Sequence, residues 1–362
     1  MRVLHLTPEP PSPVGTGGAM RQFHLIRRLG ELGHEVTVIE PERPASKIAE
    51  GLRALRRRPG VALEAVTLPV LAWQAQIFWE SMRERAVEAA RRADVVVIEH
   101  DHAAAWRRDL PLDVPVVLTL HNRSPTMYRR RGLKLEAARW RRFYGRYLRD
   151  FERFVVVSKL DLRHDETSDL VPNGVDVEEL KPTPEPDGPP TLLFTGTMNH
   201  PPNSEGVEWF VREILPRVPE APLLVVGRNP PESVTKLASN RVEVTGAVPD
   251  VRPYFQQATV VVVPLLAGGG TRLKILEAFA AGRAVVSTSI GAEGLEVEHE
   301  KHLLTADGAT EFADATARLL GDRALRERLT TEARRLVEDR YDWRILGEQL
   351  AEALTKAAER RP

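Results

Sequence analysis

The sequence predicts an α/β protein made of two Rossmann-like halves. Short runs of β-branched and aliphatic residues recur along the chain and alternate with helical stretches, which is the pattern of a parallel, doubly wound sheet. The pattern stops at a proline-dense segment, KPTPEPDGPP (181–190), and then starts again. A chain of 362 residues is too long for one ordinary core and suits two domains of about 150–200 residues each.

The first half is expected to form an N-terminal Rossmann-like domain over residues 1–180. Its apolar runs predict strands at 2–8, 35–41, 61–69, 93–101, 114–122 and 153–159. An amphipathic helix from about Ala19 to Leu32 follows the first of these strands. Gly33 stands where such a helix is expected to end.

The second half is expected to form a C-terminal Rossmann-like domain over residues 191–342, after a stiff linker at 181–190. Its apolar runs predict strands at 191–197, 222–228, 242–248, 258–266 and 283–289. The sequence EDRYDW interrupts the pattern, and a last amphipathic helix is expected from about Trp343 to Glu359.

Composition narrows the class of protein. The formal net charge is +0, so no global field attracts the chain to nucleic acid, and no nucleic-acid partner is expected. Cysteine is absent, which excludes disulfides and thiolate metal sites. The start, MRVLHLTPEPPSP, lacks the apolar core of a signal peptide, and no apolar run approaches the ~20 residues of a membrane span. These features predict a soluble cytoplasmic protein.

The segment GGGTRLKILEAFAAG (268–282) carries the strongest chemical signal. It follows a predicted strand and starts a predicted helix, so Arg272 and Lys274 lie where the helix dipole disfavours cations by ~0.3–1 kcal/mol each. A bound diphosphate would reverse that effect, and the backbone amides of Gly268, Gly269 and Gly270 could approach it. The alternative without a ligand is a surface ion pair between Lys274 and Glu277, three residues apart.

Seven segments together resemble one known family in order and spacing. They are GTGGAMRQFHLIRRLGELGHEVTVI, LTLHN, VVVSKLDL, VPNGVDVEEL, TGTMNHPPN, VTGAVPDVRPYFQQATVVVVPL and GGGTRLKILEAFAAGRAVVSTSIGAEGLEV. The chain resembles the family 4 glycosyltransferases, which are retaining enzymes of GT-B fold, over nearly its whole length. It is most similar to the subgroup that assembles bacterial exopolysaccharides and cell-surface glycans.

The resemblance implies two Rossmann-like domains facing a central cleft, with a C-terminal helix (343–362) that crosses back to the first domain. It implies that a nucleotide-diphosphate sugar binds mainly to the second domain. Glu277 would then hold the ribose, and Arg272 and Lys274 would contact the diphosphate as catalytic residues, with Gly268, Gly269, Gly270 and Thr271 beside them. Gly196, Gly246 and Val248 would complete the donor site from the other loops.

The first domain is implied to contribute four residues. Gly17 and Gly18 would close on the phosphates, Arg21 would lie nearby, and His121 would lie beside the transferred sugar as a third catalytic residue. The acceptor would be a hydroxyl of a glycan or of a lipid-linked molecule.

Two positions depart from the family pattern. Gly269 stands where many members have the first Glu of a paired-glutamate motif. The loop GTMNHPPN lacks the basic pair that many members place there, so Arg272 and Lys274 are inferred to supply the phosphate charge. The alternative function is therefore a GT-B protein without transfer, such as a nucleotide-sugar epimerase or a degenerate nucleotide-sugar-binding module.

Enzymes of this type are thought to use no protein nucleophile. The acceptor hydroxyl attacks from the face that the diphosphate leaves, and a phosphate oxygen takes its proton. Side chains and dipoles that neutralise the diphosphate remove the need for a metal, so no cofactor and no metal site are expected.

Two other motifs have more than one interpretation. GTGGAM (15–20) resembles a dinucleotide fingerprint, but Met20 fills the third glycine position, so an NAD-dependent oxidoreductase is disfavoured. EHDH (99–102) with His121 has metal-ligating residue types, and the non-metal interpretation is favoured.

The basic region 129–154 has a stripe of apolar residues at helical spacing: Leu133, Ala137, Trp140, Tyr144, Tyr147 and Phe151. It is interpreted first as a helix packed on its sheet with a solvated arginine face. Peripheral contact with the inner membrane face or with a lipid-diphosphate acceptor is the alternative.

Overall fold

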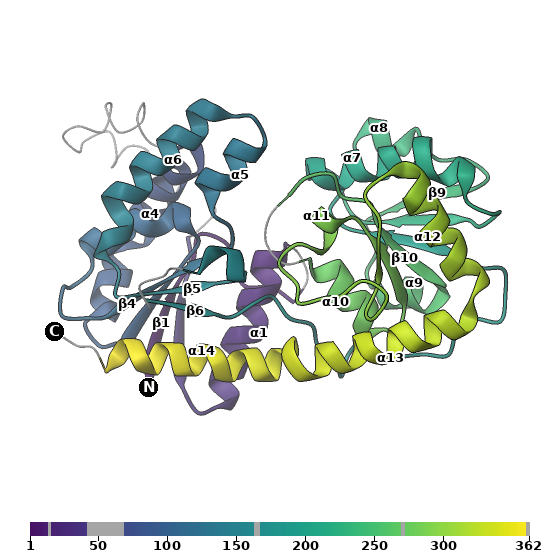
Figure 1. The fold of residues 1–362 in the computed structure, drawn as a ribbon. Coiled ribbons are helices and arrows are strands. Elements are labelled where there is room, and N and C mark those ends of the chain that lie inside the picture. Colours follow the sequence, from purple (N-terminus) through teal and green to yellow (C-terminus); the bar gives the residue numbers. More distant parts are fainter. Residues whose placement is uncertain (14–15, 42–68, 163–166, 269–271, 360–362) are drawn as a thin grey trace. The chain divides into compact units, whose positions relative to one another are not determined.

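The computed structural model of the chain describes residues 1–13, 16–41, 69–162, 167–268 and 272–359. The chain divides into two compact units (Figure 1). Unit 1 comprises Met1–Pro172 and Leu346–Pro362, and unit 2 comprises Asn173–Ile345. The C-terminal helix α14 (Trp343–Ala358) therefore leaves unit 2 and rejoins unit 1, as predicted.

Unit 1 is built on a parallel sheet whose order, within the described residues, is β2-β1-β3-β4-β5-β6. The strands are β1 (Arg2–Leu6), β2 (Glu35–Ile39), β3 (Val95–Glu99), β4 (Val116–Leu120), β5 (Arg153–Val156) and β6 (Ser168–Leu170). Because β1 pairs with both β2 and β3, the strand order reverses between β1 and β3. Ligands of open α/β sheets bind at such a reversal, outside the carboxyl ends of the strands.

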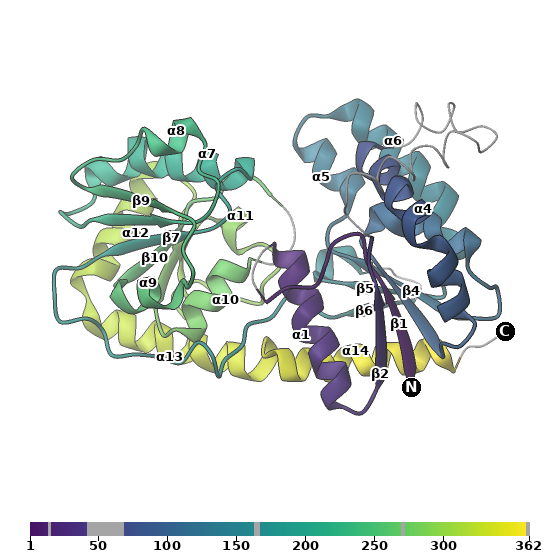
Figure 2. The ribbon, with the colours of Figure 1, turned by 180° about the vertical axis from the view of Figure 1, so that it is seen from behind.

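Helices cover both faces of this sheet (Figures 1 and 2). They are α1 (Gly17–Glu31), α4 (Val70–Ala90), α5 (Ser124–Arg130), α6 (Lys134–Tyr147) and α14, with short 3-10 helices η1 (Asp101–Asp109), η2 (Leu148–Asp150) and η3 (Lys159–Asp161). Trp79 of α4 and Trp140 of α6 pack with Leu4 and Ile98 of the sheet in one core cluster. On α1, Arg28 pairs with Glu348 of α14 at 2.8 Å.

Unit 2 has a second parallel sheet, of order β12-β11-β10-β7-β8-β9 in the described residues. The strands are β7 (Leu192–Thr195), β8 (Leu223–Val226), β9 (Val242–Gly246), β10 (Val260–Val263), β11 (Ala284–Ser287) and β12 (Leu304–Thr305). Its helices are α7 (Pro201–Trp209), α8 (Glu232–Thr235), α9 (Arg252–Gln257), α10 (Leu273–Ala280), α11 (Ser289–Ala292), α12 (Ala309–Gly321) and α13 (Arg323–Arg340), with η4 (Phe210–Ile214) and η5 (Leu215–Arg217) continuing α7. Here the order reverses between β7 and β10.

The predicted doubly wound α/β fold is confirmed, and the strands predicted within the described residues are present but shorter. The strand expected at 61–69 falls almost wholly outside the described residues. The sequence did not predict β6 and β12, each of which forms one edge of its sheet. With three and two residues, they are too short to show a period of two.

The proline-dense segment does not lie at the unit boundary. The structure divides the chain between Pro172 and Asn173, whereas the sequence placed the linker at 181–190. The reason is that this segment is bound to unit 2: the guanidinium of Arg283 donates to the carbonyls of Thr183 and Pro184. Among the described helices, none combines the length and apolarity needed to cross a membrane.

Candidate active site

Most of the described predicted site residues of unit 2 lie at the carboxyl ends of its strands. Gly196 follows β7 and Gly268 follows β10, the two strands between which the order reverses. Lys274 is the second residue of α10, the helix that follows the glycine loop. Gly269, Gly270 and Thr271 lie outside the described residues. The location is the one at which an open parallel sheet binds a ligand.

The ammonium of Lys274 is held by two side chains that the sequence analysis did not select. Nζ donates a hydrogen bond to Oδ1 of Asn203 at 2.8 Å and lies 3.9 Å from the centre of the Phe194 ring. The Asn203 amide is itself fixed, since Nδ2 donates to the Thr197 carbonyl at 2.9 Å. Burial, together with the charge of Arg272, lowers the pKa of Lys274 to about 7. A positive charge here is therefore poorly compensated by the protein alone.

Arg272 and Glu277 complete the charged group around Lys274. Arg272 is the N-cap of α10, and its guanidinium lies over Gly268, where an added Cβ would come within 2.7 Å of Nη2. Nη2 also approaches the Ile290 carbonyl at 3.3 Å. Burial raises the pKa of Glu277, although the Lys274 charge opposes that effect. Burial is the main influence on the pKa of both Lys274 and Glu277. The solvent-exposed ion pair between them that the sequence offered as an alternative therefore does not describe them.

Three glycines line the ends of neighbouring strands. Gly227 N–H donates to the Gly246 carbonyl at 3.1 Å, and Gly196 N–H donates to the Val226 carbonyl at 3.0 Å. A Cβ on Gly227 would lie only 1.6 Å from the Gly196 carbonyl oxygen, and one on Gly196 would lie 3.0 Å from Lys274 Nζ. Side chains are therefore excluded at Gly196 and Gly227, and the backbone at Gly196 lies close beside Lys274. Val248, the other predicted residue, packs against the edge of the unit 2 core.

In unit 1, helix α1 starts at Gly17 and Gly18, two residues before the predicted start at Ala19. Thr16 caps the helix by accepting from the Ala19 N–H, and its hydroxyl donates to Glu9 at 2.5 Å. A Cβ on Gly18 would lie 3.1 Å from Cε1 of His100, so glycine allows the start of α1 to approach this imidazole closely.

His121, after β4, belongs to a buried charged cluster. Its Nε2 lies 2.6 Å from Oε2 of Glu99, and the other carboxylate oxygen of Glu99 lies 3.4 Å from His5 Nε2. Burial alone would raise the pKa of Glu99, but the hydrogen bond with His121 and the nearby cationic groups lower it to about 2. Glu99 therefore stays ionised and holds His121 in a fixed orientation. The sequence placed Glu99 in this loop without assigning it a partner.

Arg21 lies beneath this cluster. Its side chain is fully buried, and Nη1 donates to the Pro172 carbonyl at 2.6 Å. Burial lowers its pKa to about 10, and the charge of Glu99 partly offsets the desolvation. Among the described residues, no group of three or more His, Cys, Asp or Glu side chains is placed to hold a metal ion.

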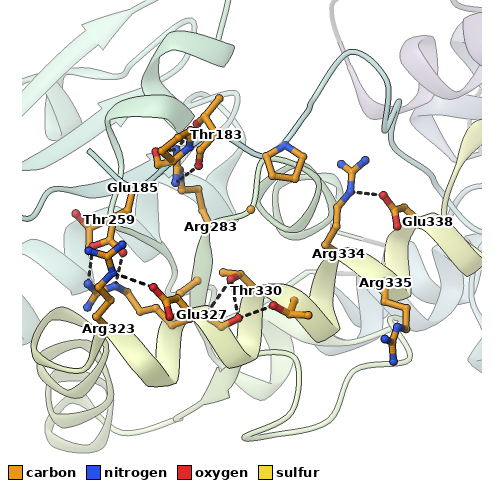
Figure 3. A pocket seen from close by; sticks show the side chains of 16 residues that line it. Thr183, Glu185, Thr259, Arg283, Arg323, Glu327, Thr330, Arg334, Arg335 and Glu338 are labelled. Atoms are coloured by element: carbon orange, nitrogen blue, oxygen red, sulfur yellow. Dashed lines mark hydrogen bonds and ion pairs between the residues drawn. The ribbon is translucent and has the colours of Figure 1, made fainter. Parts of the chain in front are cut away.

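Unit 2 also carries a pocket of about 570 Å³ that contains none of the predicted site residues (Figure 3). It lies between the proline-dense segment and α13, and most of its charged side chains bond to one another or to nearby carbonyls. Arg283 donates to five oxygens, among them the Phe255 carbonyl, and Arg326 pairs with Glu185 at 2.5 Å. These arginines attach the segment to unit 2, so the pocket has a structural explanation.

The basic region 129–154 forms α6 and the turns that flank it. Ala137, Trp140 and Tyr147 are buried in the core of unit 1, as expected for an amphipathic helix. Leu133, counted in the apolar stripe, is instead exposed because it precedes the helix, and Leu135 in its first turn is 71% exposed. Next to these leucines in the chain stand two exposed basic residues, Arg131 and Lys134.

Comparison with known proteins identifies the family. The model described as Glycosyltransferase Family 4 matches residues 16–179, and the model described as Glycosyl transferases group 1 matches residues 189–322. The phosphatidyl-myo-inositol mannosyltransferase of Mycolicibacterium smegmatis is 28% identical over 355 residues, which cover 91% of this chain and 87% of that protein. The protein of the same name from Mycobacterium leprae is 32% identical over 195 residues, so the match spans only about half of its length (51%).

A solved structure supports the fold. Sucrose-phosphate synthase from Thermosynechococcus elongatus superposes with a TM-score of 0.76 at 16% identity, covering 98% of this chain and 99% of the other. At that identity the likeness concerns the GT-B architecture alone. With both halves matched in sequence and the whole chain matched in fold, the chain belongs to the family 4 glycosyltransferases of GT-B fold.

Proposed function

We propose that this chain is a retaining glycosyltransferase that moves a sugar from a nucleotide-diphosphate sugar to a hydroxyl of a glycan or lipid-linked acceptor in cell-surface polysaccharide synthesis. The observation that carries the proposal is Lys274. Its ammonium is desolvated, oriented by Asn203 and the Phe194 ring, and bordered by glycine loops at the strand-order reversal of unit 2. Burial disfavours the charged form of this ammonium, and a dianionic ligand beside it would stabilise that charge again.

The proposed reaction places charge on the diphosphate. The bond between the anomeric carbon and the phosphate oxygen breaks, and the acceptor oxygen bonds to the same face of that carbon. The hydroxyl proton goes to the departing phosphate oxygen. Lys274, Arg272 and the amides of 268–270 would stabilise the growing charge, and Glu277 would accept hydrogen bonds from the ribose. Preorganised charge of this kind often supplies the largest part of catalysis.

Unit 1 is proposed to act on the same donor. The first-turn amides of α1 at Gly17 and Gly18 would bind phosphate oxygens, since helix N-termini attract anions. His121, oriented by the Glu99 carboxylate, would contact the transferred sugar. Arg21 is buried, so we assign it an indirect role through Glu99.

Two further proposals concern partners. Because the protein cations can neutralise the diphosphate, transfer is proposed to need no divalent metal. The acceptor is proposed to be membrane-bound, since the relatives from both mycobacteria are named for phosphatidyl-myo-inositol. The exposed Leu133 and Leu135, next to basic residues at the start of α6, would let unit 1 bind an anionic lipid surface peripherally.

The test is a thermal-shift titration with UDP, GDP, ADP, dTDP and CMP, each with and without EDTA. A ligand at 100 times its Kd should raise the free energy of unfolding by ~2.7 kcal/mol, which gives a clear shift. The Lys274→Ala variant should bind the stabilising nucleotide ~10–100-fold more weakly, because a charge-assisted hydrogen bond is lost. The matched control is Lys236→Ala, which removes an exposed lysine paired with Glu232 in the same unit and should change nothing.

Three results would contradict the proposal. If no diphosphate stabilises the chain, the donor site is wrong. If EDTA removes the shift and Mg²⁺ restores it, the metal-independent mechanism is wrong. If a nucleotide sugar binds but no sugar reaches any lipid or glycan acceptor, the non-transferring alternative gains support from Gly269, the residue that replaces the usual Glu.

A further inference from the structure

His100 adopts a backbone conformation that residues with side chains avoid. Its φ is 70° and its ψ is 138°. Non-glycine residues with positive φ mostly have ψ near ~30–60°, and positive φ combined with a much larger ψ is close to the region that only glycine populates readily. The residue stands directly after β3, at the strand-order reversal of unit 1.

Hydrogen bonds on both sides fix this conformation. The His100 N–H donates to the Thr119 carbonyl at 3.0 Å, and its carbonyl accepts from the Ala103 N–H at 3.1 Å. The first bond ties the residue to the end of β4, and the second starts the helix η1. Glycine could take the same conformation without strain, so the histidine side chain is retained here although it makes the backbone less stable.

The strain places the imidazole in a stack of rings. The His100 ring lies 4.0 Å from the His121 ring at an interplanar angle of 19°, and 5.0 Å from the His102 ring at 23°. Its side chain is 16% exposed, and Nε2 lies 3.8 Å from Glu9 Oε2, beyond hydrogen-bond distance. Within the described part of the chain, neither ring nitrogen of His100 has a hydrogen-bond partner.

The charge state suits a neutral ligand group. Burial, reinforced by His121, His102 and Arg21, lowers the pKa of His100 well below its usual value. A neutral imidazole has one donating and one accepting nitrogen, and a sugar hydroxyl can both donate and accept. A diphosphate oxygen, which only accepts, would prefer a cation.

We propose that His100 is a further substrate-contacting residue, whose imidazole hydrogen-bonds a hydroxyl of the transferred sugar beside His121. This inference rests on the proposed function, which assigns His121 to that sugar. It explains why a strained residue occupies a position that glycine would fill more easily: the backbone distortion aims the ring at the ligand.

The experiment compares His100→Ala, which removes the ring and keeps the strain, with His100→Gly, which removes both. For the full chain, calorimetry would give the Kd of UDP and GDP and of UDP-glucose and GDP-mannose, and donor hydrolysis would be followed without acceptor. Both variants should bind the nucleoside diphosphate within twofold of the wild type. Binding or hydrolysis of the intact sugar donor should weaken by ~10-fold in both. His100→Gly should melt at least ~2 °C above His100→Ala.

The control is Glu300→Gly, which relieves a φ of 60° at an exposed position of unit 2 and should leave every ligand Kd unchanged. The proposal is overturned if donor binding and hydrolysis both stay within twofold of wild type in the two His100 variants. It is also overturned if the alanine variant melts as high as the glycine variant, since the strain would then be absent. If the wild type binds none of UDP, GDP, ADP and dTDP, the proposed function fails and this inference falls with it.

Discussion

The charge on Lys274 depends on pH near neutrality. Its pKa is about 7 instead of 10.5, because burial and Arg272 oppose the charge while Glu277 only partly supports it. In the ligand-free protein the charged fraction falls as the pH rises above 7, whereas a bound diphosphate requires the ammonium. Nucleotide binding at pH 8 should therefore take up a proton, and the affinity should fall by as much as ~10-fold per pH unit.

Calorimetry at pH 8 in two buffers of different ionisation enthalpy measures that proton directly. Lys274→Arg is the control, since a guanidinium stays charged and should bind without uptake. Equal heats in the two buffers for the wild type would contradict the prediction.

The free energy of unfolding depends on pH in the opposite direction to the nucleotide affinity. Between pH 7 and 10.5 the unfolded chain binds more protons at Lys274 than the folded chain does. The contribution of this lysine therefore makes the fold more stable as the pH rises.

At the scale of elements, one arginine attaches the proline-dense segment to unit 2. Arg283 precedes β11 and donates to oxygens of Thr183, Pro184, Phe255 and Gln256. Arg283→Met keeps the apolar stem but removes all five hydrogen bonds, which are buried or partly buried. It should lower the free energy of unfolding by ~2 kcal/mol or more in urea denaturation, without changing nucleotide affinity.

Arg335→Met is the matched control for this variant. Arg335 lines the same pocket, but it is exposed and its pairing with Glu332 spans 3.7 Å (Figure 3). Its loss should change the free energy of unfolding by less than ~0.5 kcal/mol. If the two variants are equally stable, the segment is not held in the way described.

The elements also show what could be predicted from sequence. The apolar run and Gly282 predicted α10, and the cations in its first turn pointed to an anion site. Asn203 and Phe194 were not predicted, because they meet Lys274 only after α7 and β7 have packed beside α10. Likewise, Glu99 and His121 stand 22 residues apart and meet because β3 pairs with β4. Strand order, which the apolar periodicity does not encode, brings these groups together.

For the whole molecule, the prediction concerns the membrane. If α6 of unit 1 binds anionic lipid, the protein should float with phosphatidylinositol vesicles at low salt and stay behind with phosphatidylcholine vesicles. Leu135→Glu should abolish flotation, since it places a carboxylate in the interface. Leu112→Glu is the control, because Leu112 is 81% exposed in the loop before β4 of the same unit. Flotation that both variants retain would exclude α6 as the contact.

The path of the chain through the two units has a consequence for synthesis on the ribosome. Unit 2 is one continuous stretch of the chain. Unit 1 needs both the first 172 residues and helix α14, which starts at Trp343. The N-terminal part must therefore wait until α14 has been translated, a delay of roughly 10–40 s at about 5–20 residues per second. During that interval the side of its sheet that α14 will cover stays open to water and to chaperones. The part of the protein made first is thus the part completed last.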